Sequence, residues 1–91
     1  MKSIDEINRE WLAGGTSAVQ SIAELLPHFA QLGVEAVLVR VPPNLQNHVV
    51  AFAKKQDFEL IIGEAQADGQ DTAPWIALRD WVKRGTPTNV L

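Results

Sequence analysis

The segment between Gly33 and Pro43 constrains the fold of this chain most. Residues 34–41 form an almost continuous apolar run rich in β-branched side chains, with a glycine before it and two prolines after it. Such a run is typical of a buried strand, and prolines cannot continue a hydrogen-bonded ladder. We therefore expect a central β-strand over residues 34–41.

A second apolar run lies at about residues 58–63, after a segment with helical spacing that Asn44 can cap. Two parallel strands need a crossover connection, and a helix is the usual one. The sequence thus predicts an α/β fold: a small sheet built on one βαβ unit, with strands at about 34–41 and 58–63.

Two helices are predicted before this unit and should pack on the sheet. Ser3 and Ser17 each begin a capping box, with Glu6 and Gln20 three residues later. Apolar residues at helical spacing follow both boxes. Pro27 lies inside the second pattern, where it must kink the helix or begin a new turn.

Residues 74–84 fit two structures. Pro74 near the start and Gly85 after the end are typical of a helix. The turn signal Asp68-Gly69 instead suits a hairpin that would make this element a third strand. The pattern favours the helix, and the strand is the alternative. We expect residues 86–91 to form a loose C-terminal tail.

Composition limits the classes of function. A chain of 91 residues can form one domain, residues 1–91, around one modest core. Its net charge of −3 and its scattered basic residues argue against phosphate binding in nucleic acids. It contains no cysteine, which fits a reducing compartment, and no apolar stretch of membrane-spanning length. We expect a cytoplasmic protein without nucleic-acid or membrane partners.

No sequence pattern indicates catalysis or a cofactor. The only histidines, His28 and His48, form no recognisable metal motif, and no serine lies in a nucleophile elbow. The acidic stretch around Asp68 lacks the ligand spacing and final glutamate of a calcium loop. We expect no metal and no cofactor, and an enzyme is a weaker hypothesis than a binding module.

The tryptophans have two explanations. They can belong to the core, or they can anchor a partner, because aromatic side chains are enriched at interfaces. A sheet of two or three strands would also leave unpaired edges, which self-association would cover. The interface candidates are Trp11, Trp75 and Trp81.

A small-molecule site, if present, is expected at the carboxyl ends of the two predicted strands. In an open α/β sheet the loops that leave the strands at this edge form a crevice. The ligand-binding candidates in these loops and at the start of the intervening helix are Pro43, Asn44, Asn47, Gly63, Glu64 and Gln66.

From Leu25 onward, the order of features resembles the small domain that precedes the catalytic domain of some Nudix hydrolases. The residues that carry this resemblance are Leu32-Gly33, Val41-Pro42, Asp57-Phe58-Glu59 and Trp81-Val82, with Pro87 in the exit. Ile61-Ile62-Gly63-Glu64 departs from the usual His-His-Ala-Glu of that domain, and the Nudix catalytic signature is absent from the chain. The resemblance implies an accessory domain similar to half of an acetyltransferase-like fold, with a strand at 75–82.

The leading hypothesis is a non-enzymatic protein-interaction or regulatory module that associates with itself or with another protein. The alternative is a domain that binds a small ligand or an acyl group at the strand ends.

Overall fold

The structure is a computed structural model, and it describes residues 1–85. Within that range it contains six helices and no strand: α1 (Ile4–Leu12), α2 (Ala18–Leu32), α3 (Val34–Leu38), α4 (Pro43–Ala53), α5 (Phe58–Ala67) and α6 (Ala73–Lys83). The predicted α/β fold is therefore wrong, because the described part of the chain has no sheet. The tail predicted at 86–91 lies outside the described residues.

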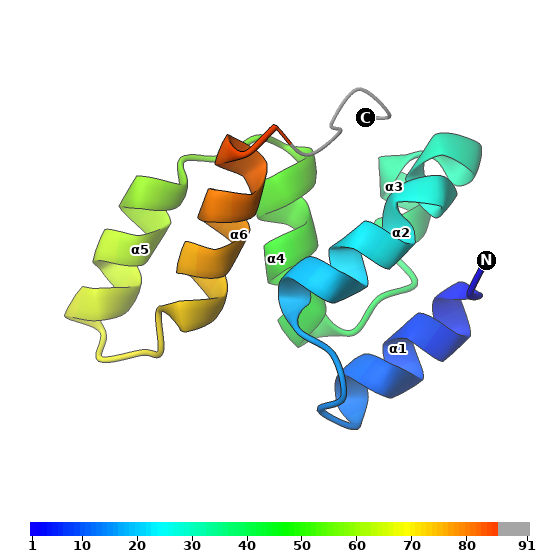
Figure 1. The fold of residues 1–91 in the computed structure, drawn as a ribbon, viewed down its shortest axis with the longest axis horizontal. Coiled ribbons are helices and arrows are strands. Elements are labelled where there is room, and N and C mark those ends of the chain that lie inside the picture. Colours follow the sequence, from blue (N-terminus) through cyan, green and yellow to red (C-terminus); the bar gives the residue numbers. More distant parts are fainter. Residues whose placement is uncertain (86–91) are drawn as a thin grey trace.

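Helix α2 is the centre of the arrangement. It packs against α1, α3, α4 and α6, whereas α5 packs mainly on α6 and forms one end of the molecule (Figure 1). Ile22, Leu25 and Phe29 point from α2 into the core and are at most 3% exposed. The other helices and the turn after α3 contribute the remaining core residues, which include Ile4, Ile7, Val37, Leu38, Val41, Leu45, Val49, Phe52 and Leu78.

The two predicted N-terminal helices are present with their caps. The Ser3 hydroxyl accepts a hydrogen bond from the Glu6 amide at 3.1 Å, and the Ser17 hydroxyl accepts one from the Gln20 amide at 3.1 Å. Each cap satisfies an amide that has no partner inside its own helix. Pro27 lies inside α2, with its ring on the exposed side.

Residues 34–41, predicted as a strand, instead form α3 and the turn that follows it. Gly33, at φ +87°, ends α2 and turns the chain directly into α3. Val37, Leu38 and Val41 are buried while Val39 is 79% exposed. This spacing is helical, so the β-branched composition suggested a strand where the burial pattern follows a helix.

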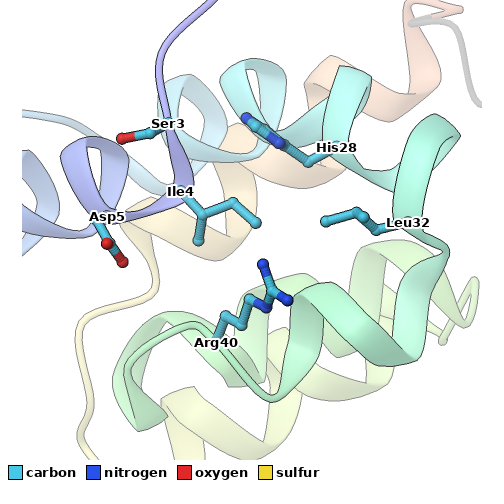
Figure 2. Close-up of a pocket in the computed structure, with 6 residues that line it drawn as sticks. All are labelled: Ser3, Ile4, Asp5, His28, Leu32 and Arg40. Atoms are coloured by element: carbon cyan, nitrogen blue, oxygen red, sulfur yellow. The ribbon is translucent and has the colours of Figure 1, made fainter.

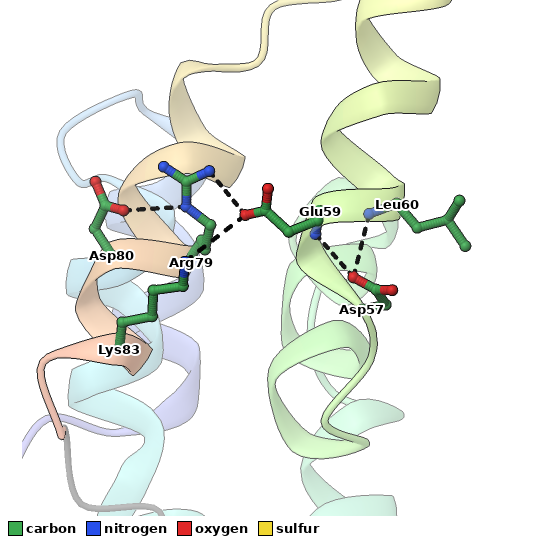
Figure 3. Close-up of polar contacts among 6 residues, drawn as sticks. All are labelled: Asp57, Glu59, Leu60, Arg79, Asp80 and Lys83. Carbon is green, nitrogen blue, oxygen red and sulfur yellow. Dashed lines mark hydrogen bonds and ion pairs between the residues drawn. The ribbon is translucent and has the colours of Figure 1, made fainter.

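The second predicted strand, at 58–63, is part of α5. Asp57 caps this helix, because its Oδ1 accepts hydrogen bonds from the amides of Glu59 at 3.0 Å and Leu60 at 3.3 Å (Figure 3). The less exposed side chains then recur at helical spacing: Phe58, Ile61, Ile62 and Ala65. An apolar run of this length fits a strand or a buried helix equally well, and here the cap begins a helix.

Residues 74–84 follow the helical alternative. Helix α6 has Pro74 in its first turn and Lys83 in its last. Both the hairpin alternative and the strand implied at 75–82 by the Nudix-type resemblance are wrong.

We predict that Pro27→Ala stabilises the protein. Proline has no amide hydrogen, so the carbonyl of Ala23 lacks its helical donor, and alanine would restore that bond. Because the ring is exposed, its removal costs little packing. We expect the free energy of unfolding, measured by urea denaturation, to rise by about 1–3 kcal/mol. Gln31→Ala, an exposed change on the same helix, should leave it nearly unchanged. A lower denaturation midpoint for Pro27→Ala would show that the ring itself stabilises the fold.

Candidate functional site

A pocket of about 250 Å³ lies where the start of α1, the end of α2 and the turn after α3 meet. We call it the Arg40 pocket. Figure 2 shows the Arg40 guanidinium reaching between Ile4 and Leu32 toward His28, while the Asp5 carboxylate points away from this space. The lining residues are Ser3, Ile4, Asp5, His28, Leu32 and Arg40.

Side chains from two helices hold the turn that carries Arg40. The Asn8 side-chain amide on α1 donates a hydrogen bond to the Arg40 carbonyl at 2.6 Å. The Gln46 side-chain amide on α4 donates one to the Leu38 carbonyl at 2.8 Å. Carbonyls at the end of a helix have no partner within that helix, so these bonds satisfy them and anchor the turn. The backbone of Arg40 is therefore held in place by α1 and α4.

The wall of the pocket opposite Arg40 contains His28, which is bound to the N-terminal segment at Lys2. His28 Nε2 lies 2.7 Å from the Lys2 carbonyl, and because a carbonyl can only accept, Nε2 donates. The Lys2 ammonium lies 2.6 Å from the Glu10 carboxylate and 2.7 Å from the Glu24 carboxylate. Hydrogen bonds to Glu10 and then to Glu24 raise the pKa of Lys2 above its usual range. These contacts tie residue 2 to both α1 and α2.

The Arg40 pocket combines an unpaired cation with an apolar floor. No carboxylate in residues 1–85 pairs with the Arg40 guanidinium, which can bind a carboxylate through two parallel hydrogen bonds. The buried Ile4 lies on one side of it and Leu32, which is 45% exposed, lies on the other (Figure 2). The volume is below the roughly 300–1,000 Å³ of small-molecule sites. The pocket therefore suits one apolar side chain next to a carboxylate.

A second pocket, of about 320 Å³, lies between the end of α4, the start of α5 and the end of α6. Its apolar part is made by Phe52, Phe58 and Val82, and Lys55 and Gln56 contribute the polar groups. Lys55 follows α4 in the left-handed conformation, at φ 53°, and no carboxylate of the described residues pairs with its ammonium group.

An aromatic cluster joins α1, α4 and α6. The Trp11 indole on α1 donates a hydrogen bond to the Asn44 side-chain oxygen at 3.1 Å. His48, one turn further along α4, stacks on Trp75 of α6, with ring centroids 4.3 Å apart and an angle of 22° between the planes. Trp11 and the same imidazole form a T-shaped pair, with centroids 6.1 Å apart and an angle of 64° between the planes. His48 thus lies between two indoles that come from distant parts of the sequence.

The surroundings of His48 oppose its protonation. Nδ1 lies 3.1 Å from the Asn44 carbonyl and so carries the ring's hydrogen. Nε2 is buried and has no partner among the described residues. A proton on Nε2 would place a charge there without an acceptor, and burial accordingly lowers the pKa of His48.

The predicted interface residues lie inside this arrangement, each partly buried. Trp11 and Trp75 flank His48, and Trp81 stacks on Phe52 with centroids 5.4 Å apart. All three tryptophans pack against the core and keep some exposed surface. Their role at an interface between chains stays a prediction.

The predicted ligand-binding residues do not form a crevice at strand ends, because residues 1–85 contain no strand. Pro43, Asn44 and Asn47 belong to the first turns of α4. Gly63, Glu64 and Gln66 are exposed on α5, and α6 lies between α5 and α4 in Figure 1. Only Asn44 of the six has a side-chain partner here, and that partner is Trp11.

Sequence reasoning missed Arg40 as a site residue. Its one signal is a charged residue near the end of an apolar run, which by itself also fits a strand terminus. The neighbours that make the pocket, Ile4 and Leu32, come from two other segments of the chain.

No protein family, curated protein or solved structure matches this chain. The resemblance to the domain that precedes Nudix catalytic domains therefore stays a prediction. None of the helices in residues 1–85 is both long and apolar enough to cross a membrane.

We predict that His48 makes stability depend on pH. The pKa of His48 is lowered in the folded state, so the unfolded chain, with a pKa of about 6.5, binds the proton more readily. The contribution of neutral His48 to the free energy of unfolding is therefore complete above about pH 6.5. It is lost as the pH falls toward the lower pKa of His48 in the folded state. We expect His48→Phe, which keeps an aromatic ring, to remove this loss.

The measurement is the difference in free energy of unfolding between wild type and His48→Phe at several pH values from 7.5 to 5.5, by urea denaturation. The wild type should lose stability relative to the variant as the pH falls. The opposite trend would show that the stacked Trp75 ring stabilises the imidazolium more than burial disfavours it.

Proposed function

We propose that this chain is a non-enzymatic protein-interaction module that recognises a partner segment in the Arg40 pocket. The observation that carries the proposal is the unpaired Arg40 guanidinium between the apolar side chains of Ile4 and Leu32. Such a site complements a segment that presents an apolar side chain next to a carboxylate. The absence of cysteine favours a reducing compartment, so the cytoplasm is the proposed location.

The surroundings of the pocket support recognition of a protein. Val39, beside Arg40 in the chain, and Leu32 are both exposed apolar side chains. Apolar walls exclude water and strengthen a charge-assisted hydrogen bond, and arginine is enriched in protein interfaces. One apolar side chain contributes about 1.5–3 kcal/mol and one charged hydrogen bond a similar amount. These two contributions together are comparable to the cost of association, so the contact is weak by itself and gains affinity from the neighbouring apolar surface.

The test uses a synthetic alanine-based helical peptide that carries one leucine and, four residues later, one glutamate. Titrated into ¹⁵N-labelled protein, it should shift the amide resonances around Ile4, Leu32 and Arg40. Arg40→Glu should abolish these shifts because it places two carboxylates together. Arg9→Glu, which reverses an exposed arginine outside the pocket, should leave them unchanged.

A peptide with lysine in place of glutamate is the matched ligand control and should not bind. Equal shifts with both peptides, or shifts centred away from the three named residues, would contradict the proposal.

The second pocket favours a different function, binding of an acyl carboxylate. Phe52, Phe58 and Val82 could cover an alkyl chain, and the Lys55 ammonium could meet its carboxylate. Its volume of about 320 Å³ reaches the lower end of the small-molecule range.

We predict that, if this function holds, decanoate quenches or shifts tryptophan fluorescence, because Trp81 stacks on Phe52 at this pocket. Decanol, which lacks the charge, should bind more weakly, and Lys55→Asn should remove the difference between the two. Asparagine suits the left-handed backbone at this position. Equal binding of decanoate and decanol to the wild type would exclude a role for Lys55.

A further inference from the structure

We infer that the partner of the Arg40 pocket is a second copy of this chain, which docks α5 with Leu60 on the apolar floor and Glu64 against Arg40. The inference rests on the proposed function of the pocket and adds the identity of its occupant.

Helix α5 carries the required pair of side chains on its free side. Leu60 is 60% exposed and points away from α6 in Figure 3. Glu64 follows one turn later, is exposed and has no cationic partner in the described part of the chain. Residues four apart on a helix are neighbours, with about 5–6 Å between their Cβ atoms. Leu60 and Glu64 therefore present an apolar side chain next to a carboxylate.

Glu59, in the first turn of α5, differs from Glu64 because cations of its own chain neutralise it. Glu59 accepts a hydrogen bond from the Arg79 guanidinium at 2.8 Å, and the Lys83 ammonium lies 3.9 Å away (Figure 3). Both cations belong to α6 of the same chain. The cations of α6 thus neutralise Glu59, whereas Glu64 is left for a cation outside the chain.

Gly63 gives the same face of α5 a second unusual property. Glycine inside a helix is unfavourable compared with alanine. Apart from its own helix and chain neighbours, nothing in residues 1–85 lies within 4 Å of the position that a Cβ at Gly63 would occupy, so packing within this part of the chain does not require a glycine. A missing side chain beside Leu60 and Glu64 lets another protein approach the helix backbone closely.

The two surfaces lie at opposite ends of the molecule. In Figure 1, α5 forms one end of the longest axis, which measures 36 Å, and α3 lies toward the other with the N-terminus. They cannot meet within one chain, so they pair between copies. Because the paired surfaces differ, two copies can dock reciprocally as a closed pair, or successive copies can dock head to tail as a ring or an open chain.

The experiment is sedimentation velocity of the whole chain at concentrations up to about 1 mM, in about 50 mM salt to limit screening of the ion pair. The wild type should show a sedimentation coefficient that rises with concentration. Arg40→Glu and Glu64→Arg should each weaken association by about tenfold or more, because each places like charges together. Arg9→Glu should behave as the wild type.

Mixing is the decisive step. In an equimolar mixture, each contact between an Arg40→Glu chain and a Glu64→Arg chain pairs a cation with a carboxylate. Association should therefore return. Gly63→Ala should weaken association while raising the thermal midpoint of the chain.

A wild type that stays monomeric at about 1 mM would overturn the inference. So would association that survives both single charge reversals, or a mixture that fails to associate. The proposed function is judged separately by the synthetic peptide. A pocket that binds the peptide in a chain that stays monomeric keeps its function and has a different partner.

Discussion

The buried face of α2 is the constraint on which the rest of the structure depends. Ile22, Leu25 and Phe29 lie along it, and α1, α3, α4 and α6 all pack on this helix. Burial of one such side chain contributes about 1.5–3 kcal/mol, a large part of the roughly 5–15 kcal/mol that stabilises a small domain. Because α2 holds both α1 and α3, it also determines where the walls of the Arg40 pocket meet.

The helices with clear punctuation could be predicted, and the two short apolar segments could not. Ser3 and Ser17 indicated helix starts by themselves, since a cap is a local interaction. In the segment from Val34 to Val41, the β-branched composition favoured a strand. The structure has a helix and a turn there, because packing buries Val37, Leu38 and Val41 at helical spacing. Asp57, directly before α5, is a local signal for a helix start, and the prediction of a strand at 58–63 rested on the apolar run alone.

A candidate site is harder to predict than a helix, because it is assembled from distant segments of the chain. Asn44, predicted as a ligand contact, has a side chain that accepts a hydrogen bond from Trp11, 33 residues away in the chain. The proposed binding role of Arg40 depends on Ile4 and Leu32, which no local sequence pattern connects to it. The tryptophans were recognised as important, yet which of them would stack on His48 depended on how α1 and α6 pack.

The position of α5 at one end, with α6 as its main neighbour, has a consequence for how stability is distributed. A helix with few tertiary neighbours opens more often than the core, so its amide hydrogens exchange faster than those of α2. Any protein that covers the free side of α5 would slow that exchange by suppressing local opening. Helix α5, which has few tertiary neighbours in its own chain, would then gain more order than the core when a second protein binds to it.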